Sequence, residues 1–389
     1  MLVRSRCLII KKMEKHQHFF EKNLRNSKNM STFGPKLQIY ILTTQIMKKL
    51  NYLFGAAAMA IAMVMTSCAV DDLPVDPNEP KIHDGDELAT AITKYCDVIN
   101  GVPTLTLPAG VSVVLNEAVE LKTPLVIKGD EAAPAKIKIG AEGKFIGGLE
   151  IANAEIDASE MGSPLVTLGT ADADEWSFAS VGLINVTMTG LKKAIVYSGC
   201  KNYDVSLIVE NSRIQVAADV TVFDFTKGSF PIEFNVKNST FWAPEATGKA
   251  FFSSQSGQKA TEMEGGSTTF DFENSTFYNL TKGKNFFTHR QNSQTWLTYI
   301  VKDCIFVNCG KSGQVIAGMN GGGKSKNPTW DVSGNVFNFD GADTSADEAN
   351  GDDDEPIKDS KAVVVNFADA ANGDFTQAEA KAGDPIWIK

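Results

Sequence analysis

Histidine is scarce in this chain of 389 residues, which contains only four. Beyond residue 67, the histidines are His83 and His289. Zinc sites take several histidine or cysteine ligands, so two isolated histidines exclude a His-rich zinc site in the body of the chain. We therefore expect no bound zinc there.

An apolar run long enough to cross a membrane is also missing near the N-terminus. Residues 53–65 are thirteen apolar or small residues, whereas a transmembrane helix needs about 20. Two lysines precede this run, and Thr66, Ser67 and Cys68 follow it. This order is typical of a signal peptide, and its cysteine resembles that of a bacterial lipobox. We therefore expect residues 47–67 to be a lipoprotein signal peptide and Cys68 to be lipidated; the alternative is an ordinary signal peptide with a chance cysteine.

In the body of the chain, basic residues are outnumbered by acidic ones. Residues 1–67 hold 11 Lys and Arg against 2 Asp and Glu, a net charge of +9. The whole chain is at −10, so residues 68–389 are at −19, which argues against a nucleic-acid partner. Residues 1–46 are basic and have no core pattern, so we interpret them as a mis-called upstream segment. Residues 68–82 are rich in Pro and Asp and predict a tether.

Nearly the same five-residue stretch occurs twice, as NSTFW at residues 238–242 and as NSTFY at residues 274–278. Similar segments precede and follow it at steps of 26 to 36 residues. The anchor positions of these segments are Asn153, Asn185, Asn211, Asn238, Asn274, Asp303 and Gly334. Variable steps of this size are typical of a stacked repeat architecture.

Around each anchor, the side chains alternate in character. The residues two before and three after the anchor are apolar, the residue one after is mostly small, and those between are mixed or polar. This alternation predicts two short strands, and Asn, Asp and Gly at the anchor favour a left-handed bend between them. The chain from residue 83 to 389 is therefore expected to be an all-β, single-stranded parallel β-helix, right-handed by the usual rule for parallel crossovers.

Both ends of such a solenoid need covering. Residues 84–96 place apolar side chains on one helical face and predict a short N-terminal capping helix, with Asp84 or Asp86 at its start. Residues 363–370 and 383–389 are apolar and predict a C-terminal plug. Cys304 falls in an inward column, so a buried free thiol is favoured over a metal ligand or a disulfide.

These features together resemble a family of proteins. The lipobox, the capping helix, the Asn-anchored repeats and the terminal AGDPIW look like a Bacteroidetes surface lipoprotein with a pectate-lyase-like right-handed β-helix domain of uncharacterised function. Asp71 and Asp72 resemble the acidic surface-export signal of such lipoproteins. The resemblance covers residues 47–389 and implies an outer-membrane, cell-surface location and partner proteins of polysaccharide uptake. It brings no catalytic motif.

One column predicts a binding site. The fourth residue after each anchor should point outward, which makes Trp242 and Tyr278 exposed neighbours on adjacent turns, with Lys237 and Glu273 as polar neighbours. Exposed aromatic rings suit the apolar faces of sugars, so we expect a polysaccharide or oligosaccharide there. The alternative is that a loop or the C-terminal residues cover both rings.

A second candidate is the loop of residues 279–296. A lyase needs a base and a cation beside a uronate, and Lys284, His289 and Arg290 are of the right types. The alternative is an ordinary polar loop. Paired carboxylates facing a groove would instead favour a hydrolase.

The sequence thus predicts a lipid-anchored surface protein that binds or presents a glycan, without catalysis of its own. The alternatives are a polysaccharide lyase or hydrolase on the β-helix face, and a protein-binding adhesin or accessory subunit of a glycan-uptake complex. The acidic residues 340–356 supply oxygen ligands for calcium but lack EF-hand spacing, so a solvated insertion is the alternative. No other cofactor is expected.

Overall fold

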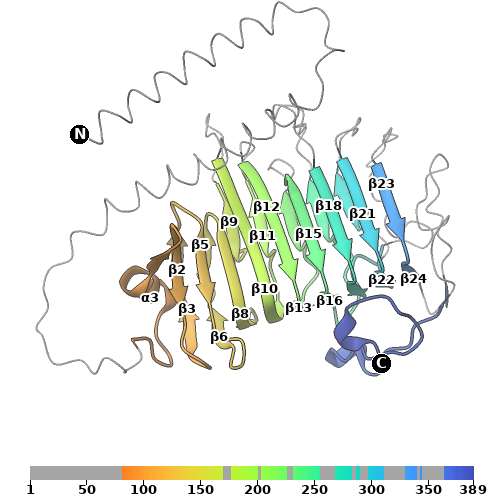
Figure 1. Ribbon diagram of the computed structural model, residues 1–389, viewed down its shortest axis with the longest axis horizontal. Helices are drawn as coiled ribbons and strands as arrows, with labels where there is room; N and C mark the ends of the chain where they lie inside the picture. The colour runs from red at the N-terminus through yellow and green to blue at the C-terminus, as the bar shows by residue number, and fades with distance from the viewer. Residues whose placement is uncertain are drawn as a thin grey trace, which may run out of the picture. The chain divides into compact units, whose positions relative to one another are not determined.

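The computed structural model describes part of the unit Asp71–Lys389. The described ranges are 81–169, 177–199, 203–225, 231–254, 268–282, 286–289, 297–310, 329–339, 342–343 and 363–389. The predicted signal peptide, Cys68, and the tether up to residue 80 lie outside these ranges. The described part confirms the predicted all-β parallel β-helix with a short N-terminal helix (Figure 1).

The turns of the β-helix supply strands to three parallel ladders, and the third ladder is described for all but the last two turns. The pre-bend ladder consists of β2 (Val102–Thr106), β5 (Leu125–Lys128), β8 (Leu149–Asp157), β10 (Ser177–Leu191), β12 (Tyr203–Glu210), β15 (Glu233–Lys237), β18 (Thr268–Glu273), β21 (Leu297–Lys302) and β23 (Thr329–Ser333). The post-bend ladder consists of β3 (Ser112–Leu115), β6 (Ala135–Ile139), the second halves of β8 and β10, β13 (Arg213–Val216), β16 (Thr240–Trp242), β19 (Thr276–Tyr278), β22 (Ile305–Val307) and β24 (Val336–Phe339). The third ladder consists of β4 (Ala118–Glu120), β7 (Lys144–Ile146), β9 (Val166–Leu168), β11 (Val196–Ser198), β14 (Phe223–Phe225), β17 (Phe252–Ser254) and β20 (Phe287–His289).

The bend between the first two ladders lies at the predicted anchors. All seven anchor residues have a positive φ, from 48° at Asn238 to 71° at Gly334. Asparagine side chains also bond along the stack: the Asn185 amide donates to Asn153 Oδ1 at 2.9 Å, and the Asn238 amide donates to Asn211 Oδ1 at 3.3 Å. The anchors therefore set the backbone turn, and some of them also tie one turn to the next.

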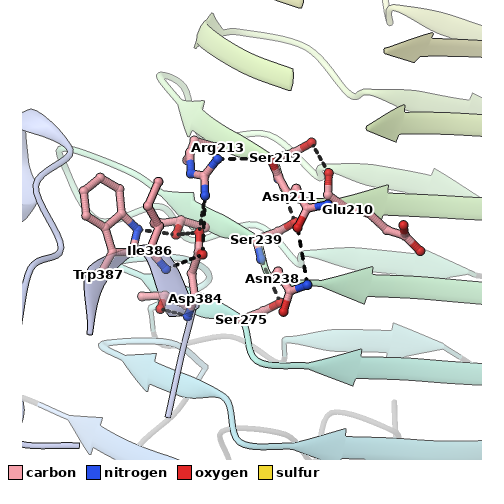
Figure 2. Close-up of polar contacts among 12 residues, drawn as sticks. Glu210, Asn211, Ser212, Arg213, Asn238, Ser239, Ser275, Asp384, Ile386 and Trp387 are labelled. Atoms are coloured by element: carbon pink, nitrogen blue, oxygen red, sulfur yellow. Dashed lines mark hydrogen bonds and ion pairs between the residues drawn. The ribbon is translucent and has the colours of Figure 1, made fainter. Parts of the chain in front are cut away.

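A second row of side chains follows directly after the bend. The backbone N–H of Ser212 donates to Ser239 Oγ at 3.1 Å, and that of Ser239 donates to Ser275 Oγ at 3.2 Å (Figure 2). Each of these hydroxyls donates to the carbonyl two residues earlier, at 2.8 Å. This serine row satisfies buried backbone groups at the bend. The alternation pattern predicted its burial but not its hydrogen bonds.

The core is formed by the side chains two residues before, one residue after and three residues after each bend, as the alternation predicts. Phe277 stacks on Phe241 with ring centroids 5.8 Å apart and on Phe306 with centroids 4.9 Å apart, and Phe306 stacks on Phe337. The free thiol of Cys304 is fully buried, and burial raises its pKa. The prediction of a buried free thiol is confirmed. Because the raised pKa keeps the thiol protonated, Cys304 is unreactive.

The N-terminal end is capped by α3 (Leu88–Tyr95), which buries Leu88 and Ala91 against the core. The predicted cap residue is wrong: Glu87 holds the N-cap position and makes no capping hydrogen bond. Asp84 instead accepts from the N–H of Ser112 at 2.8 Å. Strand β1 (Asp97–Ile99) follows and pairs antiparallel with β2.

The C-terminal segment, residues 363–389, was expected to plug the last turn. It does reach the last turn, where Asn338 of β24 bonds to the backbone of Val363 and Val365, and β25 (Ala342–Asp343) pairs with β24. It then passes through the 3-10 turns η2 (Ala370–Asn372) and η3 (Pro385–Trp387) along the outer side of the post-bend ladder (Figure 1). Its residues Val365, Ala380 and Ala382 pack on outward side chains of the post-bend strands, and none of residues 363–389 belongs to the central core cluster. The segment therefore covers a side of the solenoid, and the prediction that it plugs the end is wrong.

Candidate functional site

The outer side of the post-bend ladder is the face where we expected an exposed aromatic pair. Trp242 and Tyr278 are register partners on adjacent turns and point away from the main core, as predicted. Trp242, however, is only 6% exposed, and its ring packs on Phe375 of the C-terminal segment at 5.8 Å. Tyr278 contacts Phe367 and Phe375 in the same way. The predicted exposure of this pair is wrong at Trp242, because residues far along the chain cover it.

A buried carboxylate holds the C-terminal segment on this side. Asp384 is 1% exposed and lies 3.3 Å from the Arg213 guanidinium, and it accepts from the Thr240 hydroxyl at 2.9 Å (Figure 2). The Trp387 indole N–H donates to Thr240 Oγ1 at 2.8 Å, and the Asp384 N–H donates to Thr276 Oγ1 at 3.0 Å. Burial raises the pKa of Asp384, and Arg213 opposes that rise.

The matching outer side of the pre-bend ladder, here called the pre-bend face, is formed by residues one, three and five before the bend. Over strands β12 to β21, its side chains are charged or polar except for two isoleucines. They are Glu210, Lys237, Glu273, Lys302, Ile208, Asn235, Asp271, Ile300, Ser206, Glu233, Thr269 and Thr298. The column next to the bend alternates in sign from one turn to the next, which stabilises the stack.

Three of these side chains form a compact cluster. Lys237 Nζ lies 2.8 Å from Asp271 Oδ2 and 3.4 Å from Glu273 Oε2. The hydrogen bond with Asp271 is the largest cause of the raised pKa of Lys237. The Asp271 side chain is 17% exposed, and its Oδ1 is buried with no hydrogen-bond partner among the described residues. That shielded oxygen is closed to a ligand in this conformation, so a hydroxyl or amide donor can reach only the exposed part of the cluster.

A second carboxyl pair lies nearer the N-terminal end of the face. Burial, and then the charge of Glu210, raise the pKa of Glu150. Gly182, the register partner of Glu150 on the next strand, leaves room for this side chain, because a Cβ there would lie 3.0 Å from Glu150 Cγ. Glu150 is therefore an acidic group whose charge is disfavoured by the fold.

An exposed aromatic ring lies at the edge of the same face. Phe178 of β10 is 56% exposed, and its register partner on the next strand is Asp204. Two positions along, Ser180 pairs with Ser206, whose hydroxyl bonds to the Glu233 carboxylate. This places an apolar ring beside hydroxyls and carboxylates on a side that the C-terminal segment does not contact.

The predicted glycan-binding residues lie on two different faces of the β-helix. Lys237 and Glu273 do lie together, but before the bend, whereas Trp242 and Tyr278 lie after it. Of the predicted lyase residues, Lys284 and Arg290 lie outside the described ranges, and only the backbone of His289, at the end of β20, is described. That hypothesis stays a prediction.

Sequence reasoning missed Asp271, Phe178 and Asp384. The alternation in TTFDFE was a readable signal, since it places Asp271 and Glu273 on one face. Phe178 carried a weaker signal, because a lone aromatic next to the alternating run of β10 is also typical of a core residue. Asp384 carried no signal in the sequence, because its partner Arg213 is 171 residues away.

Within the described ranges, no group of three or more His, Cys, Asp or Glu is arranged to hold a metal ion. The candidate calcium stretch, residues 340–356, lies outside those ranges apart from 342–343. No helix of the described part is both long and apolar enough to cross a membrane.

Comparison of the chain with protein families, with curated proteins and with solved structures finds no match.

Proposed function

We propose that this protein binds a polysaccharide on the pre-bend face. The observation that carries the proposal is the cluster of Lys237, Asp271 and Glu273, whose charged side chains are 32%, 17% and 32% exposed. Sugar hydroxyls both donate and accept hydrogen bonds, so they complement carboxylates and a lysine at one site. The Trp242 face that the sequence favoured is covered, which leaves the pre-bend face as the better surface.

The architecture suits a polymer. Neighbouring strands of a parallel ladder repeat about every 4.8 Å, so polar side chains in one column form a regular row. The rigid ladder also fixes the side chains in advance, which lowers the entropic cost of ordering a binding site. Both features support a binding role for a chain-like ligand.

The proposed location is the outer membrane at the cell surface, with Cys68 carrying a lipid anchor. The lipobox-like order of residues 66–68 supports it. Metabolic labelling with a palmitate analogue tests whether Cys68 is lipidated. Incorporation into the wild type and not into Cys68→Ser is expected, and equal labelling of both proteins would rule out Cys68 as the lipidated residue.

A hydrolase is the second candidate, since Asp271 and Glu273 are two carboxylates on one strand and one face. Two residues along a strand span about 6.6 Å, which is within the order of separation that glycosidase carboxylates require. Release of reducing ends from a glycan that binds distinguishes hydrolysis from binding alone. The binding proposal predicts no release.

Affinity electrophoresis of the full-length protein through gels that contain a panel of plant and host polysaccharides tests the proposal. We expect retardation by at least one glycan and loss of that retardation in Asp271→Asn/Glu273→Gln. The matched control is Glu155→Gln/Glu160→Gln, which removes two exposed carboxylates on the post-bend side. If no glycan retards the wild type, or if both double variants behave alike, the proposed site is wrong.

A further inference from the structure

The pre-bend face also points to the class of glycan and to how it lies. Resting on the proposed function above, we propose that the ligand is an uncharged polysaccharide that crosses the stack of turns obliquely. One sugar ring lies on Phe178, and hydroxyls further along the chain bond to Asp271 and Glu273.

Phe178 has the position of a stacking platform. Its neighbour Ala179 points into the core and is 1% exposed, so Phe178 itself points outward from the start of β10. The strand on its other side, β8, begins only opposite Val181, which leaves the ring without a strand neighbour there. A folded chain gains nothing from a phenyl ring held in water, whereas the apolar face of a sugar would shield it.

Polar side chains lie on the β12 side of the ring and further along its own strand. Asp204 lies on the next strand at the same level, and Ser180 and Ser206 lie two residues further along. The hydroxyl of Ser206 bonds to the Glu233 carboxylate, which orients that group along the face. Stacking from below and hydrogen bonds from the side together recognise a pyranose ring.

The charge of the face selects against anionic glycans. On strands β12 to β21, the three columns of the face hold four carboxylates against two lysines. The carboxylates are Glu210, Glu233, Asp271 and Glu273, and the lysines are Lys237 and Lys302. Both lysines are already in ion pairs, with Asp271 and Asp331. A uronate or sulfated chain would meet net repulsion there, so an uncharged chain is the ligand class.

The two contact points set a minimum length for the ligand. Strand β10, which carries Phe178, is separated from β18, which carries Asp271, by β12 and β15. Three steps of about 4.8 Å separate the two points along the stack, and Asp271 also lies four residues further along its strand than the position level with Phe178, so they are roughly 20 Å apart. An oligosaccharide that spans both is expected to bind more tightly than one that reaches a single point.

Isothermal titration of the full-length protein with size-graded oligosaccharides of the retarding glycan tests the inference. We expect Phe178→Ala to weaken binding of the longer oligosaccharides roughly tenfold, and Phe178→Tyr to keep it. Ile386→Ala, which removes another exposed apolar side chain from the C-terminal segment, is the matched control and should bind as the wild type does. Binding should also persist at high salt, because an uncharged ligand is not held by ion pairing.

The outcomes separate this inference from the proposed function. If Asp271→Asn/Glu273→Gln loses binding while Phe178→Ala stays within twofold of the wild type, the Phe178 subsite is wrong and the binding face stands. If only uronate or sulfated glycans are retained, the ligand class is wrong. If no glycan binds the wild type, both proposals fail.

Discussion

The bend residues offer the sharpest test of the fold, and Asn238 is the best placed of them. Its φ is 48°, and its side-chain amide donates to Asn211 at 3.3 Å. Alanine in this left-handed conformation costs about 1–2 kcal/mol, and the lost hydrogen bond costs about 0.5–1.5 kcal/mol more. Asn238→Ala is therefore expected to lower the free energy of unfolding by about 2–3 kcal/mol.

Asn238→Gly separates the two contributions. Glycine removes the same hydrogen bond but adopts a positive φ without a steric penalty. We expect Asn238→Gly to be more stable than Asn238→Ala by about 1 kcal/mol, even though glycine adds freedom to the unfolded chain. The matched control is Asn235→Ala, which removes an outward asparagine from the regular strand that precedes the bend.

Urea denaturation followed by circular dichroism measures these differences, provided that the slope with urea is the same in all variants. The expected order of transition midpoints places Asn238→Ala below Asn238→Gly, with Asn235→Ala closest to the wild type. If Asn238→Ala and Asn238→Gly unfold at the same urea concentration, the left-handed bend is not what the asparagine contributes, and the reasoning is refuted.

Three further changes test other parts of the structure by the same denaturation assay. Phe277→Ala removes a fully buried ring from the aromatic stack and should cost about 3–5 kcal/mol; a loss under 1 kcal/mol would contradict the packing. Arg213→Ala leaves Asp384 buried without its cation and should release the C-terminal segment to limited proteolysis, with a cost of about 1–3 kcal/mol because other donors to the carboxylate remain; unchanged proteolysis would count against it. Burial and the charge of Glu210 raise the pKa of Glu150 in the folded protein. The wild type therefore has its full stability below the ordinary carboxyl pKa, where Glu150 is protonated, and loses stability as the pH rises through the raised pKa and Glu150 ionises. Glu150→Gln should therefore gain stability over the wild type at pH 7.5 but not at pH 4, and a constant difference would contradict this.

The fold was predictable because its determinants are local. Each bend needs a residue that tolerates a positive φ, and each flanking strand shows the alternation of buried and exposed side chains within a few residues. The outward direction of Trp242 was readable in the same way. Its burial was not, since it depends on Phe375, which lies more than a hundred residues later.

The candidate site was only partly predictable. Alternation placed Lys237 and Glu273 on an outer face, but their pairing depends on which turns are neighbours, and therefore on the 36-residue step between Asn238 and Asn274. Asp271 looked like an ordinary solvated side chain of a strand. Only the stacked register brings it to Lys237 and shields one of its oxygens.

The claim that the pre-bend face binds a glycan is tested most directly by photoaffinity labelling. A diazirine-bearing oligosaccharide of the glycan that retards the protein would be crosslinked to the full-length chain, and the labelled peptides identified by mass spectrometry. Our account predicts labels within residues 177–184, 203–210 and 268–273. Labels confined to residues 240–242, 276–278 or the C-terminal segment would contradict it and return the site to the aromatic face.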